Sequence, residues 1–159
     1  MTFQPDTSSI HDRCCRRAWL RRLAAAPLGA LVLRPAAAVT PAVDGAEAAA
    51  FIEMAFEAQR QATAAGDQPY GAVVVKDGEL VVATPSRVVT AGDPTAHAEM
   101  EALRDAARHL GTRDLSGCIL YSSSRPCPMC EAAAYWAGIE RLVHGRAITD
   151  AGAPTLRRC

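Results

Sequence analysis

The chain has 159 residues, half of them hydrophobic, with 17 basic and 17 acidic residues and a formal net charge of zero. This length allows one domain with a real hydrophobic core, although alanine inflates the hydrophobic fraction. Six arginines and two aspartates fall in residues 1–38, so the remainder is net acidic, which argues against a partner with a phosphate backbone such as nucleic acid.

The N-terminal residues are typical of a targeting segment. Residues 16–21 (RRAWLR) resemble the twin-arginine pattern, an apolar run of 11 residues covers 23–33, and the alanines at 36–38 offer a cleavage site. That run is too short to anchor the chain across a bilayer. We predict a twin-arginine signal peptide in residues 1–38, a mature domain in residues 39–159, and export to the periplasm or medium. A start codon chosen too far upstream would instead mean a cytoplasmic protein.

The first elements of the mature domain are a helix and a hairpin. Apolar positions at helical spacing between 46 and 65 predict an amphipathic helix, which Gly66 and Asp67 end. Two β-branched runs, at 73–75 and 80–82, flank a turn that contains Asp77-Gly78, a strong hairpin signal. These two runs are therefore predicted to be neighbouring antiparallel strands.

Helices and strands alternate in the second half of the chain. Asp93 or Thr95 is expected to cap a helix that runs from Thr95 to Leu110. A strand at 118–122, a helix that opens with two cysteines, and a short strand at 141–144 follow. This order implies an α/β protein with a mixed sheet covered by helices on both faces.

The strongest chemical signal is His97-Ala98-Glu99, followed by the pair Cys127 and Cys130. Imidazole and thiolate are zinc ligands, and a zinc ion with three protein ligands keeps a fourth position open for water. Two cysteines three positions apart at a helix start share one face near the positive dipole end, which favours thiolate over thiol. The pattern predicts a hydrolytic zinc site.

The cysteine pair has two other interpretations. A C-x-x-C pair alone is typical of a thioredoxin-like redox couple or of half a structural zinc site. The upstream His-x-Glu, the strand before the cysteines and the lack of a second C-x-x-C pair favour the hydrolytic site.

A carboxylate is needed as the acid and base. A dication, two thiolates and a neutral imidazole sum to zero charge, so the metal withdraws little charge from its water, and a side chain must move the proton. Glu99 and Glu101 are the candidates. Residues two apart on a regular helix point to nearly opposite sides, so Glu101 would share the face of His97 better than Glu99. The spacing alone leaves both open.

The combined motifs resemble those of the cytidine deaminase-like zinc deaminases, whose signature is H-x-E and P-C-x-x-C. Residues 69–78, 93–99 and 127–137 are similar to bacterial guanine deaminases and, next, to tRNA adenosine deaminases, and the resemblance covers about residues 47–145. It implies a three-layer α/β/α fold with a mixed central sheet.

The resemblance also implies a division of roles in the site. His97, Cys127 and Cys130 would hold Zn2+, and Glu99 would be the acid/base rather than a ligand. The backbone at Ala98 would contact the substrate. The implied reaction is attack by activated water on an aromatic amidine carbon with release of ammonia.

Two positions depart from the family pattern. Ser86 stands where guanine deaminases have an asparagine near the substrate, and Arg125 replaces their usual glutamate before the first cysteine. Ser86 and Trp136 are nevertheless expected to contact the substrate, as Ala98 is, although Trp136 is a candidate for the pocket wall or for the core, because large aromatic side chains serve both.

The sequence thus predicts a guanine-deaminase-like enzyme that acts on a free purine base or a small nucleoside. The alternatives are nucleic-acid editing of the tRNA adenosine deaminase type and a non-catalytic, zinc-stabilised remnant of a deaminase.

The C-terminal elements are expected to be shortened. Relatives continue beyond the strand predicted at 141–144 with a further strand and helices, which residues 153–159 are predicted not to form. Dimers are common in the family, so a homodimer is expected, in which a second subunit could complete the pocket.

Overall fold

The computed structural model describes residues 45–156, so the signal peptide predicted in residues 1–38 lies outside the described residues. The elements follow in the order α1 (Gly45–Ala64), β1 (Gly71–Lys76), β2 (Glu79–Pro85), α2 (Ala98–Leu110), β3 (Cys118–Ser122), α3 (Pro128–Ala137), β4 (Arg141–His144) and β5 (Thr149–Gly152). None of the described helices has the length and apolar character needed to cross a membrane.

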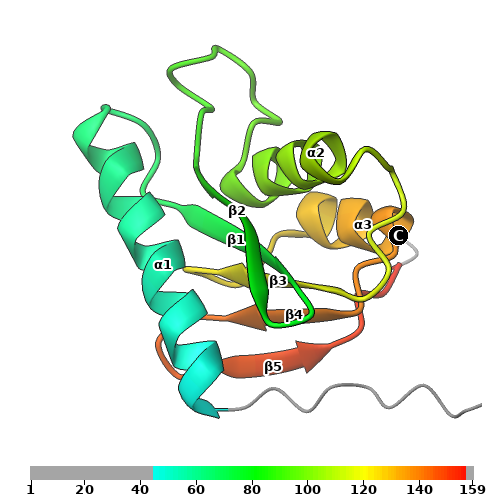
Figure 1. Ribbon diagram of the computed structural model, residues 1–159. Coiled ribbons are helices and arrows are strands. Elements are labelled where there is room, and N and C mark those ends of the chain that lie inside the picture. The colour runs from blue at the N-terminus through cyan, green and yellow to red at the C-terminus, as the bar shows by residue number, and fades with distance from the viewer. Residues whose placement is uncertain (1–44, 157–159) are drawn as a thin grey trace, which may run out of the picture. The chain divides into compact units, whose positions relative to one another are not determined.

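The strands form one mixed sheet in the order β2-β1-β3-β4-β5 (Figure 1). Strand β1 pairs antiparallel with both β2 and β3, and β4 pairs antiparallel with β5. Only β3 and β4 are parallel among the described pairs, and α3 is the crossover between them. The predicted mixed sheet is confirmed.

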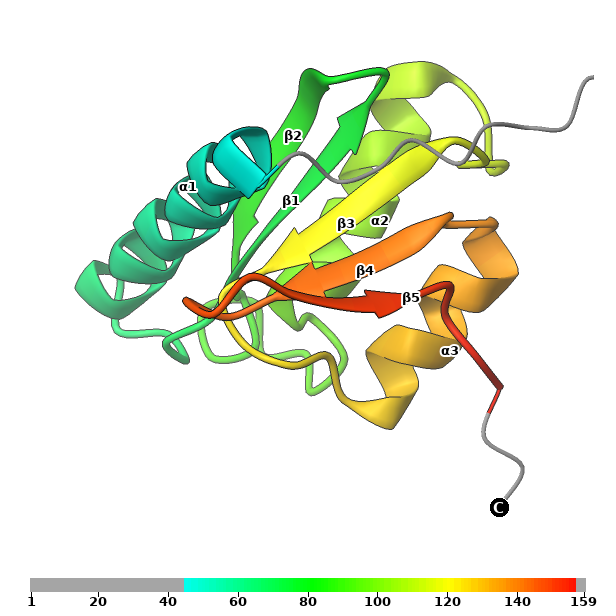
Figure 2. The same ribbon diagram turned by 90° about the horizontal axis from the view of Figure 1, so that it is seen from below.

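The sheet is covered on both faces because its strands alternate apolar side chains (Figures 1 and 2). On β1, Val73 and Val75 face α1 and share a buried cluster with Phe51. The intervening Ala72 and Val74 belong to the opposite cluster, which packs against α2 and α3. The three-layer α/β/α architecture expected from the resemblance is confirmed.

The β1–β2 turn and Gly71 show how individual residues permit this packing of the strands and α1. Asp77 and Gly78 both have positive φ, 52° and 77°, as a two-residue turn between antiparallel strands requires. At Gly71, a Cβ atom would collide with the backbone of α1 at Ala55 and Gln59. The absence of a side chain there lets α1 lie close to the start of β1.

Two elements differ from the sequence prediction. Helix α2 begins at Ala98 rather than Thr95, because Asp93 Oδ1 accepts hydrogen bonds from both the N–H and the hydroxyl of Thr95 and closes a separate turn. A fifth strand, β5, also forms beyond β4. Its sequence carries little strand propensity, and it is held by pairing with β4 and by the ion pair between Arg141 and Asp150.

Candidate active site

Two helix starts converge on one point. His97 is the N-cap of α2 and has an extended backbone, with φ −59° and ψ 152°. Cys127 is the N-cap of α3, with φ −74° and ψ 167°, and Cys130 lies in the first turn of that helix. Because the partial positive charge of a helix lies at its N-terminus, both helices favour thiolate at this point.

The three side chains form a donor set that fits zinc. The ligand atoms of His97, Cys127 and Cys130 all lie within 4.8 Å of one another. His97 Nδ1 is 3.7 Å from the sulfur of Cys127 and 3.6 Å from that of Cys130, and the two sulfurs are 3.5 Å apart. A tetrahedral zinc ion separates two sulfurs by about 3.8 Å and sulfur from nitrogen by about 3.6 Å, given its usual bond lengths.

Despite the two helix N-termini, the surroundings of Cys130 disfavour its thiolate form when no cation is bound. Burial, followed by the nearby carboxylate of Glu99, raises the pKa of the Cys130 thiol far above its ordinary value in the protein without metal. The sulfur lies 3.7 Å from Glu99 Oε2. A buried sulfur and a buried carboxylate in contact are both stabilised by a metal dication at the donor set.

The structure distinguishes Glu99 from Glu101, the two candidates for the acid/base that the spacing did not decide between. Glu99 is 4% exposed, and it faces Cys130. Glu101 instead accepts hydrogen bonds from Arg87 and Arg104, at 3.2 and 2.6 Å. The non-helical backbone of His97 removes the difficulty of two residues on opposite sides, because its side chain leaves the chain before the regular turn begins.

Three consecutive serines at the end of β3 have three different environments. The hydroxyl of Ser122 donates to Glu99 Oε1 at 2.8 Å, and both residues are buried. The hydroxyl of Ser123 accepts from the N–H of Gly71 at 3.1 Å, which ties β1 to the end of β3. Ser124 lines the cavity beside the donor set. The role of Ser122 was not predicted, and its place in a run of polar residues gave no signal for it.

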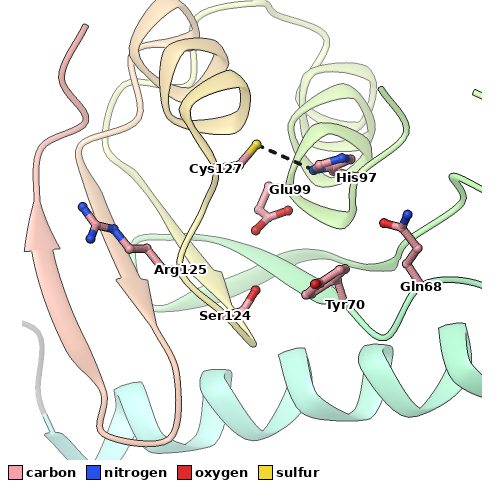
Figure 3. Close-up of a pocket in the computed structure, with 7 residues that line it drawn as sticks. All are labelled: Gln68, Tyr70, His97, Glu99, Ser124, Arg125 and Cys127. Carbon is pink, nitrogen blue, oxygen red and sulfur yellow. Dashed lines mark hydrogen bonds between the residues drawn. The ribbon is translucent and has the colours of Figure 1, made fainter. Parts of the chain in front are cut away.

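A cavity of about 560 Å³ opens over the donor set (Figure 3). Such a volume is usual for a small-molecule site. Its described lining residues come from two loops and two helix starts: Gln68, Tyr70, His97, Glu99, Ser124, Arg125 and Cys127.

The residues expected to contact substrate lie in different places. Ala98 is buried between two lining residues, and its carbonyl accepts a hydrogen bond from the Thr84 hydroxyl. Ser86 is buried and is absent from the described lining of the cavity. Trp136 is 76% exposed on α3, so it belongs neither to that lining nor to the buried core. Gln68 and Tyr70, which line the cavity, were not predicted.

A buried aspartate, Asp67, holds together the loop before β1 and the loop before α2, beside the cavity. Asp67 accepts hydrogen bonds from the N–H groups of Gln68, Val89 and Thr90 and from the hydroxyls of Ser86 and Thr90. Burial opposes its ionisation, but these bonds outweigh burial and hold the pKa of Asp67 well below its ordinary value. The network joins the loop before β1 to the loop before α2.

Known proteins are similar to this chain in sequence and in fold. Guanine deaminase of Bacillus subtilis (strain 168) is 48% identical to this chain over 83 residues, which are 52% of this chain and 53% of that protein. The solved structure of guanine deaminase from Bacillus subtilis superposes with a TM-score of 0.59 at 42% identity, covering 60% of this chain and 62% of that one.

Two further relatives are a tRNA-specific adenosine deaminase and a protein solved with a purine. The tRNA-specific adenosine deaminase of Aquifex aeolicus (strain VF5) is 40% identical over 93 residues, 58% of this chain and 62% of that protein. A solved structure in complex with 2,6-diaminopurine is 36% identical, with a TM-score of 0.59, and the match covers 61% of this chain and 55% of that one. The chain thus spans between half and two thirds of the length of these curated relatives.

The family model described as the cytidine and deoxycytidylate deaminase zinc-binding region matches residues 46–146. This range covers more than half of the chain and contains all three converging donors. The chain therefore belongs to the cytidine and deoxycytidylate deaminase family.

Proposed function

We propose that this protein is a zinc-dependent hydrolytic deaminase of a free purine base or a small nucleoside, with guanine as the first compound to test. The observation that carries the proposal is the buried carboxylate of Glu99 beside a three-donor metal site, in a cavity large enough for a small molecule. The similarity to guanine deaminase supports the choice of base.

The mechanism follows from the residues around Glu99. His97, Cys127 and Cys130 would hold zinc, which would supply a Lewis acid to activate water. Glu99 would take one proton from the attacking water and then the proton of the new hydroxyl group, and would pass them to the ring nitrogen and to the amino nitrogen that leaves as ammonia. The hydrogen bond from Ser122 holds Oε1 of Glu99 and so sets the orientation of the carboxylate.

The test is ammonia release from a panel of bases and nucleosides by the zinc-loaded full chain, with the metal-free chain as control. We expect ammonia from guanine or a related purine and none from the control. Ammonia from no compound in the panel would favour a non-catalytic zinc-stabilised domain.

Nucleic-acid editing is the second candidate, because a tRNA-specific adenosine deaminase is among the relatives. Arg125 is exposed and is the one lysine or arginine among the described lining residues, a modest electrostatic attraction for RNA. Deamination of a tRNA anticodon stem-loop would support this candidate, and failure to bind RNA at low salt would remove it.

We also propose a homodimer, which an exposed aromatic pair on α3 supports. Tyr135 and Trp136 are 45% and 76% exposed and stack edge to face, with ring centroids 5.5 Å apart. Exposed apolar clusters mark interaction surfaces in many proteins. Sedimentation velocity of the full chain should give a dimer that Trp136→Ser weakens, and a monomer at all concentrations would contradict the expectation.

Export remains part of the proposal and depends on residues 1–38 alone. A pathway that carries folded proteins would let zinc occupy the thiolates before they meet an oxidising compartment. Cell fractionation should find a mature protein that begins at Val39, and replacement of Arg16 and Arg17 by lysine should retain the precursor. An unprocessed wild-type protein in the cytoplasm would refute export, and zinc-free periplasmic protein with a Cys127–Cys130 disulfide would refute the reason given for the pathway.

A further inference from the structure

Position 86 offers no free polar group to a substrate. The side chain of Ser86 is 2% exposed, and its hydroxyl donates to Asp67 Oδ1 at 2.9 Å. The hydroxyl oxygen of Ser86 also accepts a hydrogen bond from the N–H of Val88 at 3.5 Å. This residue was expected to contact the substrate, and its hydrogen-bonding capacity is used inside the protein instead.

Gln68 has the opposite arrangement, with an anchored backbone and an uncommitted side chain. Its N–H donates to Asp67 Oδ1 at 2.8 Å, and its carbonyl accepts from the N–H of Tyr70 at 2.7 Å. The next carbonyl, that of Pro69, accepts from Gln59 Nε2 at 2.7 Å, which ties the segment to α1. Within residues 45–156 the Gln68 amide has no hydrogen-bond partner, and it lines the cavity.

The other polar groups of the cavity discriminate poorly between bases. The hydroxyls of Tyr70 and Ser124 can each donate or accept by rotation. Arg125 only donates, and Figure 3 shows its guanidinium directed away from Glu99 and across the site from Gln68. The primary amide of Gln68 instead presents a donor group, NH2, and an acceptor group, the carbonyl oxygen, side by side in one plane.

The edges of nucleobases present the complementary pattern, in which carbonyl, ring nitrogen and amino groups alternate. A site that hydrogen-bonds such an edge rejects analogues that leave its polar groups unpaired. Tyr70 lies beside Gln68 in the cavity and offers an aromatic ring on which a base can stack (Figure 3).

We propose that Gln68 is the specificity-determining residue of this site and that its amide pairs with the hydrogen-bonding edge of the base, with Asp67 as the positioning residue that holds it. This inference rests on the proposed function, because it assumes that a nucleobase enters the cavity.

The test measures base binding without turnover. Zinc-loaded full chain carrying Glu99→Gln is titrated with guanine, adenine and cytosine by isothermal calorimetry, alone and with Gln68→Ala or Gln68→Glu. The loss of one or two hydrogen bonds should weaken binding of the preferred base by about 10- to 100-fold. Gln68→Glu keeps the length but cannot donate, so it should change the ratio of affinities among the bases.

Controls separate recognition from folding. Gln61→Ala removes the same side chain from the exposed part of α1 and should leave the affinities unchanged. Zinc content and melting temperature should be the same in all variants, because within residues 45–156 the side chain of Gln68 forms no hydrogen bond to the donor set or to the core.

The outcomes distinguish this inference from the proposed function. If a base binds the parent chain and neither Gln68 variant changes its affinity or the ratio among bases, the inference is overturned and the proposed function stands. If no base binds and the wild-type chain releases no ammonia, the proposed function fails and the inference fails with it.

Discussion

Glu99 and Glu101 begin the same helix with different neighbours. Glu101 is paired with two arginines, which commits its charge to holding the start of α2. Within residues 45–156, Glu99 forms side-chain hydrogen bonds only with the Ser122 hydroxyl and the Cys130 sulfur, so its second oxygen is directed toward the donor set. The assignment of Glu99 as the acid/base therefore has a physical basis besides the resemblance.

The exchange Glu99→Gln keeps the shape of the side chain and removes its capacity to take a proton. Loss of a general acid/base costs about 10²–10⁴ in rate, so turnover should fall by that factor while zinc content stays the same. The matched exchange Glu101→Gln should lower the free energy of unfolding but change the turnover rate little. Zinc by mass spectrometry and ammonia release check both, and a fully active Glu99→Gln enzyme would refute the assignment.

Cys130→Ala should remove the metal and the activity together. Two ligands remain after this exchange, and a site of two ligands holds zinc far more weakly than one of three. The variant should lose its zinc on dialysis and melt at a lower temperature than the zinc-loaded wild type.

Cys118→Ala is the control, because Cys118 is also a fully buried thiol but belongs to the core beneath α2 and α3. It should keep about one zinc ion per chain, the number that one donor set holds. Retention of zinc by Cys130→Ala would contradict the ligand assignment.

The loops at the open side of the site depend on the ionised form of Asp67. Its folded pKa is lower than its unfolded pKa, so the stabilisation it provides is present above about pH 4 and is lost as the pH falls toward the folded value. Asp67→Asn should lower the free energy of unfolding at neutral pH, and its difference from the wild type should shrink as the pH drops below about 4.

Urea unfolding between pH 7 and pH 2.5 checks this prediction. Asp77→Asn removes the same charge from the hairpin turn, outside the network, and serves as the control. A difference between Asp67→Asn and the wild type that does not vary with pH would contradict the account.

Local patterns predicted most of the elements because each carried its own signal. The β-branched runs and the Asp77-Gly78 turn identified the hairpin, and the strands at 118–122 and 141–144 have the predicted bounds. The start of α2 was placed three residues early, because cap residues can close a turn that does not continue as a helix. Strand β5 was missed because its stability comes from its partner β4 rather than from its own sequence.

The metal ligands of the site could be predicted because they belong to short sequence motifs. His97, Cys127 and Cys130 were identified from spacing and residue type, and their convergence follows from two adjacent helix starts. Gln68 and Tyr70 precede β1 and reach the cavity only because β1 pairs with β3, which no local pattern indicates. Ser86 and Trp136, predicted to contact the substrate, are buried and 76% exposed respectively, and neither is among the described lining residues of the cavity.

The molecule as a whole combines a sheet that brings distant segments together with a metal site at the end of its central strand β3. The account depends on two sulfurs and one imidazole that share one zinc ion and leave a position for water. X-ray absorption at the zinc edge of the zinc-loaded full chain measures this coordination directly. We predict two sulfur atoms at about 2.3 Å and two nitrogen or oxygen atoms at about 2.0–2.1 Å. A shell of four sulfurs, or one without sulfur, would contradict the account.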